Sequence, residues 1–217
     1  MDRLAPFLWL WMLFFAINML WALAQAAVAS TFGARPVLVD VGFGPALLTQ
    51  RIGGIVWCFR PIALASSVGF TEAVTSPDVP PKNRLQQLSL PMHAAVILVP
   101  WMLQVAIAMA CLGATEGLHQ FLHGFTLPFE LSALPGRIER FIGLLRNGDM
   151  LRAWGLISAK IAAINLLPLP FLAGGQFLLL PWRERFPVWA GLLNVASTLV
   201  AMPWACYVAY LVFKTIF

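Results

Sequence analysis

The chain has 217 residues, of which 60% are hydrophobic and 11% are charged, and its mean hydropathy is +0.82. Soluble domains of this size carry about 25% charged residues, so the composition argues against an ordinary water-soluble enzyme. The net charge of +5 does not indicate nucleic-acid binding here. The basic residues are scattered between long apolar runs, which is how membrane proteins place charge at the level of the lipid headgroups.

Four stretches are apolar over the roughly 20 residues that a helix needs to cross a bilayer. They are residues 4–31, 90–112, 154–180 and 188–212. The third stretch contains Lys160 and a proline-rich break at residues 167–170. A cleaved signal peptide is an alternative for the first stretch because residues 22–24 have a small-x-small pattern. However, the apolar run is longer than the usual core of about 7 to 15 residues.

Between the first two spans the pattern changes from helical to strand-like. Residues 37–43 and 55–62 are rich in β-branched and aromatic side chains, and glycines at 42, 44, 53 and 54 provide turn signals. We predict a small sheet or a pair of hairpins within residues 37–70, set against the first helix. Residues 76–84, which contain three prolines, are predicted to be a polar linker.

An amphipathic helix is predicted over residues 136–147. Its apolar side chains recur at i, i+3, i+4 and i+7, and its arginines occupy other positions. The apolar set is Ile138, Phe141, Ile142 and Leu145, and the basic set is Arg137, Arg140 and Arg146. We therefore expect one integral membrane domain over residues 1–217. It would combine an all-α core of about four transmembrane helices with a small membrane-associated β-hairpin sheet.

Two motifs resemble those of a known family. Residues 32–35, 41–45 and 53–62 read FGAR, VGFGP and GGIVWCFRPI, and they resemble the membrane-associated β-hairpin region of site-2 proteases, which are intramembrane zinc metalloproteases. Residues 165–176, NLLPLPFLAGGQ, are similar to that family's third-helix motif N-x-x-P-x-P-x-L-D-G-G-H. The two motifs stand in the family's order, so the resemblance implies a site-2-protease-like fold.

The resemblance also implies where the catalytic groups would stand. The two histidines of the family's H-E-x-x-H motif correspond to Trp21 and Gln25, and its glutamate corresponds to Ala22. The aspartate ligand corresponds to Ala173, and the histidine after the glycine pair corresponds to Gln176. Indole and methyl groups cannot bind zinc, and an amide is a poor ligand for it. With no metal and no general base to activate water, we expect an inactive metalloprotease homologue without a zinc cofactor.

Other motif positions keep the family's residues. They are Gly42, Gly44, Pro45, Arg60, Pro61, Asn165, Pro168 and Pro170. We hypothesise that they still bind a membrane-spanning partner as an extended strand, without cutting it, because main-chain pairing alone supplies affinity. The alternative is that these residues are only turns and helix breaks of the scaffold.

The expected function is that of an accessory, assembly or regulatory subunit. It would be a multi-pass protein of the bacterial inner (cytoplasmic) membrane, bound to the bilayer and to other integral membrane proteins in a larger complex, and not to nucleic acid. The numbers of Lys and Arg residues expected on the two sides of the membrane are nearly equal, so they do not indicate the orientation of the protein in the membrane.

Two alternatives rest on Glu116, His119 and His123, which would share one face of a helix. They could hold a divalent ion, which would make the chain an active intramembrane metalloprotease with a relocated metal site. His119 or His123 could instead be the axial ligand of a macrocycle in an electron-transfer or light-harvesting subunit. The simpler interpretation is that these three side chains are exposed to water at the end of a helix. Lys160 either faces the vacated catalytic cavity or a partner, or extends toward the headgroups.

Overall fold

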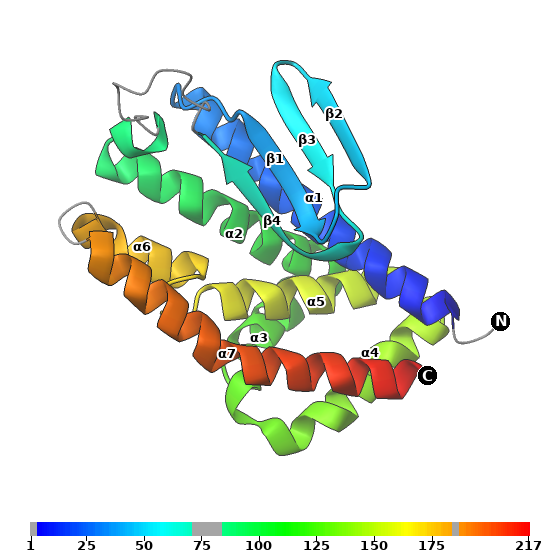
Figure 1. Cartoon of the computed structure of the whole chain (residues 1–217). Helices are drawn as coiled ribbons and strands as arrows, with labels where there is room; N and C mark the ends of the chain where they lie inside the picture. Colours follow the sequence, from blue (N-terminus) through cyan, green and yellow to red (C-terminus); the bar gives the residue numbers. More distant parts are fainter. Residues whose placement is uncertain (1–3, 71–83, 184–186) are drawn as a thin grey trace. The chain divides into compact units, whose positions relative to one another are not determined.

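Figure 1 shows a computed structural model of the chain, which describes residues 4–70, 84–183 and 187–217. The predicted linker 76–84 lies almost wholly outside the described residues. The chain forms two compact units. The sheet unit is Trp11–Pro100, and the helical unit combines Met1–Leu10 with Trp101–Phe217. The division falls within helices α1 and α2, each of which contributes residues to both units.

Most of the described chain is helical. The helices are α1 (Leu4–Thr31), α2 (Leu90–Leu112), α3 (Ala114–Leu122), α4 (Leu134–Arg146), α5 (Met150–Asn165), α6 (Ala173–Arg183) and α7 (Pro187–Ile216). Short 3-10 turns lie at Arg84–Gln87, Leu127–Phe129 and Leu131–Ala133. Three of the described helices, α1, α2 and α7 from Val188 onward, are long and apolar enough to cross a membrane. These are the first, second and fourth of the predicted spans.

The third predicted span, residues 154–180, is not one continuous helix. It is divided into α5, with 16 residues, and α6, with 11 residues. Pro168 and Pro170 lie between them, and a proline both lacks the N–H group that a helix needs and disfavours helical geometry in the residue before it. Neither piece alone has the length of about 20 residues that a straight crossing requires.

The sheet has four strands in the order β2-β3-β1-β4. The strands are β1 (Leu38–Phe43), β2 (Leu48–Ile52), β3 (Ile55–Phe59) and β4 (Ile62–Gly69). β2 and β3 form an antiparallel hairpin, and β4 pairs antiparallel with β1. β1 and β3 run parallel, which a pair of simple hairpins would not produce. The predicted sheet is therefore present, and its strand order places β2 at one edge and β4 at the other.

The sheet rests on α1 through one apolar face. Val39 and Val41 are fully buried and pack against Ala22 and Ala26 of α1. Asp40 lies between the two valines on β1, so its side chain points to the other face of the sheet. This alternation produces one apolar and one polar face.

In the helical unit, small side chains allow close helix contacts. Ala108 of α2, Phe121 of α3 and three alanines of α5 form a buried cluster. α3 follows α2 directly, after a turn at Gly113 with φ of 86°. α4 begins two residues earlier than predicted and buries Leu134, Ile142 and Leu145, which agrees with the predicted amphipathic pattern.

Gly117 provides a test of this packing. A Cβ atom added there would lie 2.7 Å from Cα and 2.8 Å from N of Met109, and a backbone cannot give way as a flexible side chain does. We expect Gly117→Ala to lower the free energy of unfolding by about 1–3 kcal/mol, measured by thermal unfolding in detergent.

Gly143→Ala is the matched control. An added Cβ there meets none of the described atoms within 4 Å, and alanine favours a helix over glycine by about 1 kcal/mol. Equal stability of the two variants would contradict the packing described for Gly117.

Candidate functional site

The positions that correspond to the family's first-helix motif lie on α1, in the sheet unit. Ala22 is fully buried and packs in the apolar cluster of Val39 and Val41. Trp21 and Gln25 are half-buried on the same helix. A carboxylate in place of the Ala22 methyl group would be enclosed by apolar side chains, which is costly for an unpaired charge. The position is therefore built as part of the hydrophobic core.

The positions that correspond to the third-helix motif lie in the helical unit. Asn165 is the last residue of α5, and Ala173 is the first residue of α6 and is 8% exposed. Gln176 is exposed, and its Nε2 atom donates to the backbone oxygen of Phe171 at 3.4 Å. The two sets of motif positions thus belong to different units.

The two positions after Ala173 must be glycine because backbone atoms lie too close for a side chain. A Cβ atom at Gly174 would lie 2.1 Å from the backbone oxygen of Leu166, and one at Gly175 would lie 2.1 Å from that of Leu169. Both glycines are therefore required where the turn between α5 and α6 folds back against the start of α6. Pro168 and Pro170 lie within this turn.

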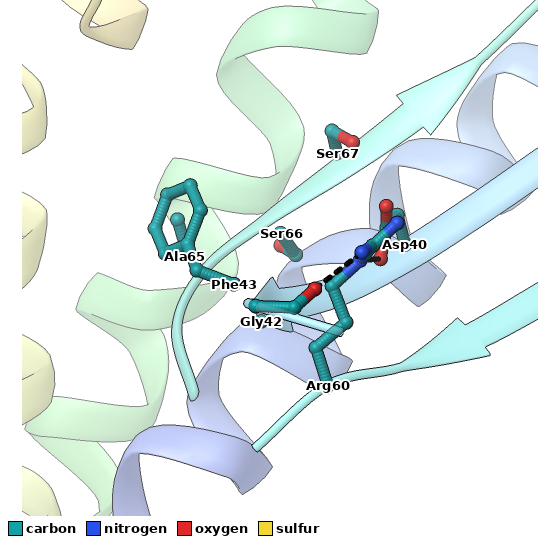
Figure 2. Close-up of a pocket in the computed structure, with 8 residues that line it drawn as sticks. Asp40, Gly42, Phe43, Arg60, Ala65, Ser66 and Ser67 are labelled. Atoms are coloured by element: carbon teal, nitrogen blue, oxygen red, sulfur yellow. Dashed lines mark hydrogen bonds and ion pairs between the residues drawn. The ribbon is translucent and has the colours of Figure 1, made fainter. Parts of the chain in front are cut away.

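Arg60 makes two contacts that we call the clamp: an ion pair with Asp40, which Figure 2 shows, and a hydrogen bond to Gly44. Arg60 follows β3, and its Nε atom donates to Oδ1 of Asp40 at 2.7 Å. Its Nη1 atom donates to the backbone oxygen of Gly44. The hydrogen bond to Asp40 is the main reason why the pKa of Arg60 is raised, so the guanidinium remains charged. Arg60 therefore joins the loop after β1 to the loop after β3.

The glycines beside this clamp have positive φ angles, 100° at Gly42 and 98° at Gly44. A Cβ atom at Gly42 would also lie 2.7 Å from the backbone oxygen of Arg60. Pro61 accepts a hydrogen bond at its backbone oxygen from the Trp11 indole, at 2.6 Å, while Pro45 is exposed. These contacts give most of the retained hairpin motif a structural role, which is the alternative that the sequence left open.

A polar row crosses the open face of the sheet. The strand register places Ser67 of β4, Asp40 of β1, Cys58 of β3 and Thr49 of β2 side by side. Thr49 Oγ1 lies 3.6 Å from Cys58 Sγ. Asp40 and Ser67 also line an open pocket of about 280 Å³, together with Arg60. This row was not predicted from the sequence, although a lone aspartate between two valines in a strand is a signal for a polar face.

The two histidines of the possible relocated metal site lie at the end of α3. His119 and His123 have their ring centroids 6.0 Å apart, at an interplanar angle of 84°. Glu116 Oε1 accepts a hydrogen bond from Gln120 at 2.7 Å, and His123 Nδ1 lies 3.1 Å from Thr126 Oγ1. Within residues 4–70, 84–183 and 187–217, no group of three or more His, Cys, Asp or Glu is placed to hold a metal ion.

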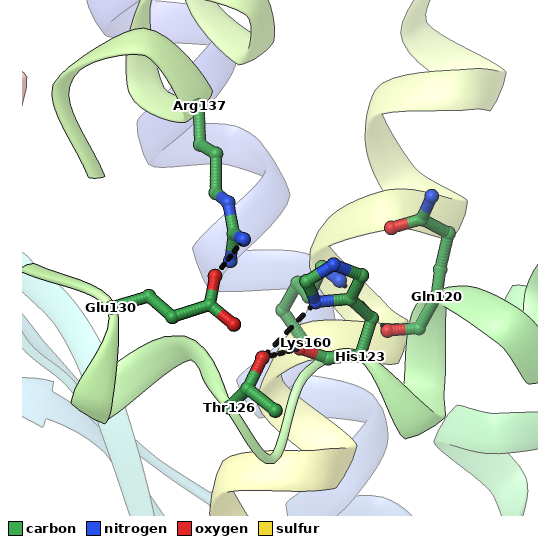
Figure 3. Close-up of polar contacts among 6 residues, drawn as sticks. All are labelled: Gln120, His123, Thr126, Glu130, Arg137 and Lys160. Atoms are coloured by element: carbon green, nitrogen blue, oxygen red, sulfur yellow. Dashed lines mark hydrogen bonds and ion pairs between the residues drawn. The ribbon is translucent and has the colours of Figure 1, made fainter. Parts of the chain in front are cut away.

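A polar network next to this helix end joins α3, α4 and α5 (Figure 3). The Lys160 ammonium donates to the backbone oxygen of Gln120 at 2.8 Å. That carbonyl is in the last turn of α3, where carbonyls lack a partner within the helix. Lys160 therefore has a partner inside the protein and does not need to reach the headgroups.

Glu130 is held in the same network by an ion pair with Arg137. A hydrogen bond with Thr126, followed by the positive charge of Arg137, lowers the pKa of Glu130. The carboxylate is therefore ionised near neutral pH, and it links the segment after α3 to α4.

No family model matches the sequence, and a search of curated proteins finds no significant relative. The resemblance to site-2 proteases therefore rests on the motif residues themselves.

The clamp can be tested by removing its cation. We expect Arg60→Ala to release the loop after β1, because both the ion pair with Asp40 and the bond to Gly44 are lost. Hydrogen–deuterium exchange of residues 42–47 should become faster. Arg51→Ala removes an exposed arginine from β2 and is the control. Unchanged exchange in Arg60→Ala would show that the clamp does not hold the loop.

Proposed function

We propose that the protein is a non-catalytic relative of the site-2 proteases, which binds other membrane proteins as an accessory, assembly or regulatory subunit. The observation that carries this proposal is the burial of Ala22 beneath Val39 and Val41. The position that would hold the general base is filled by a methyl group in an apolar core. Trp21, Gln25 and Ala173 likewise bring no good zinc ligand. Binding, rather than hydrolysis, is the activity that this arrangement favours.

The edge strand β2 supports a binding role. In the described part of the chain, β2 is at one end of the sheet and pairs with β3. All five of its residues are exposed, with Leu48 at 53% and Ile52 at 52%. An exposed, partly apolar edge is a template for an added strand. We infer that an extended segment of a membrane-spanning partner pairs with β2.

The outward-facing hydrogen-bonding groups of β2 can be identified from the hairpin. Gly53 and Gly54 form a two-residue turn, so Ile52 and Ile55 are opposite each other. The residues that flank such a turn form a hydrogen-bonded pair, and pairing alternates along the strand. The N–H groups of Thr49 and Arg51 therefore point away from β3, toward an added strand.

We further propose four membrane crossings. Residues 4–31 and 188–213 contain no charged side chain, and the rings of Phe7 and Phe217 lie 6.1 Å apart within the helical unit. α1 would thus begin, and α7 end, at the same membrane face. An even number of crossings follows, so the residues between α2 and α7 must cross once.

The pair α5 and α6 is suited to this crossing. The two helices have lengths of about 24 Å and about 16 Å. The turn between them packs against Gly174 and Gly175, and a broken helix at membrane depth is tolerated where its backbone is buried in protein. The proline break would then lie inside the membrane-embedded part of the protein.

Strand pairing can be tested by photocrosslinking from Gln50 on β2 in the native membrane. We expect an adduct with a membrane-spanning protein, and its loss in Thr49→Pro, which removes an outward N–H group. Thr49→Val is the matched control, since it keeps this group and a β-branched side chain. A photoreactive residue at the exposed Ser132 controls for position. Adducts that persist in Thr49→Pro would contradict strand pairing.

The number of crossings can be tested with short epitope tags in intact and opened cells. Tags at the two ends of the chain should be protected or accessible together, because an even number of crossings places both ends on one side. A tag inserted between Gly53 and Gly54, in the turn of the hairpin that follows α1, should show the opposite accessibility. Ends on opposite sides would rule out four crossings.

A further inference from the structure

Two cations are present at the end of α7 in the helical unit: Lys214 of α7 itself and Arg146 of α4. Residues 188–213 are uncharged, and Lys214 is the first charged residue at the end of this long apolar run. The side chain of Lys214 is exposed. A long apolar helix that ends in a lysine has its hydrocarbon boundary near that lysine. Lys214 therefore lies at the level of the lipid headgroups.

The second cation comes from α4. The Nη2 atom of Arg146 donates to the backbone oxygen of Thr215 at 2.8 Å. Because Thr215 follows Lys214 directly, this bond places the Arg146 guanidinium at the end of α7, at the residue next to Lys214. Arg146 is itself exposed, and a guanidinium has further N–H donors. Two exposed cations, one from α4 and one from α7, are thus present at the same end of α7.

The orientation of α4 is consistent with Arg146 lying at the membrane surface. Its apolar side chains Leu134, Ile142 and Leu145 are buried within the unit, while Arg140 and Arg146 are exposed. The first turns of α1 reach the same end, because the Phe7 ring contacts the Phe217 ring. The end of α7, the end of α4 and the start of α1 therefore lie together at one end of the helical unit.

From this geometry we infer that Arg146 and Lys214 form a binding site for the phosphate group of an anionic phospholipid. Guanidinium groups bind phosphate oxygens in a bidentate manner, and an ammonium adds a second positive charge. Basic sites between helices at a membrane surface are suited to anionic headgroups. The occupant is a lipid rather than a soluble phosphate because the site lies at the end of an apolar helix that would be covered by acyl chains.

The test uses the full-length protein in a neutral detergent, with native mass spectrometry to measure the affinity of added phosphatidylglycerol. Phosphatidylcholine, whose headgroup has no net charge, is the comparison lipid. We expect the wild type to prefer phosphatidylglycerol. Each cation removed should weaken that binding by about fivefold, so Arg146→Gln with Lys214→Gln should abolish most of the preference.

The control is Arg35→Gln with Arg51→Gln, which removes two exposed cations from the sheet unit and should leave the preference unchanged. If Arg146→Gln prevents folding through loss of the Thr215 contact, Lys214→Gln alone should still show the fivefold loss. An unchanged preference after removal of the two cations would overturn the proposal and would mean that they only neutralise the end of α7. Displacement of the lipid by inorganic phosphate that binds as tightly would also overturn it, in favour of a soluble ligand.

Discussion

The contact between the sheet and α1 is the constraint on which the sheet unit depends. Val39 and Val41 are fully buried against Ala22 and Ala26, and this contact needs small side chains on the helix and β-branched ones on the strand. It fixes which face of β1 is apolar, and it therefore directs Asp40 to the open face. The same contact removes Ala22 from solvent, so the position that corresponds by resemblance to the general base of the site-2 proteases is part of the core.

The open face and the edge of the sheet follow from this arrangement. Asp40 is paired with Arg60, and Arg60 also binds the loop after β1. The clamp holds the connection through which β1 leads to β2 at the outer edge. The exposed edge strand β2 and the buried Ala22 are compatible with the proposed role in binding a partner. Arg60 and Gly44 have a structural role in the clamp, and the exposed edge strand β2 is the feature that favours binding.

The helical unit depends on close packing and on a few polar contacts. Gly117 permits α3 to approach the backbone of α2, and Lys160 supplies the last turn of α3 with a hydrogen-bond donor. Close backbone contacts at small residues and hydrogen bonds between helices stabilise one particular arrangement of apolar helices, because apolar surface alone does not select a partner. Thr126 and Glu130, which follow His123, likewise link the end of α3 to α4 through hydrogen bonds and an ion pair.

The sequence by itself determined three helices that are long and apolar enough to cross a membrane, the amphipathic pattern of α4 and the presence of a small sheet. These features depend on local composition and periodicity, which can be read from neighbouring residues. The proline-rich break at residues 167–170 was visible in the sequence, and the structure showed that α5 ends before it and α6 begins after it. Only the tertiary structure showed that β1 and β3 run parallel, that Asp40 meets Arg60, and that Arg146 reaches the end of α7. Each of these three features depends on contacts between residues that are distant in the chain, and no local pattern encodes them.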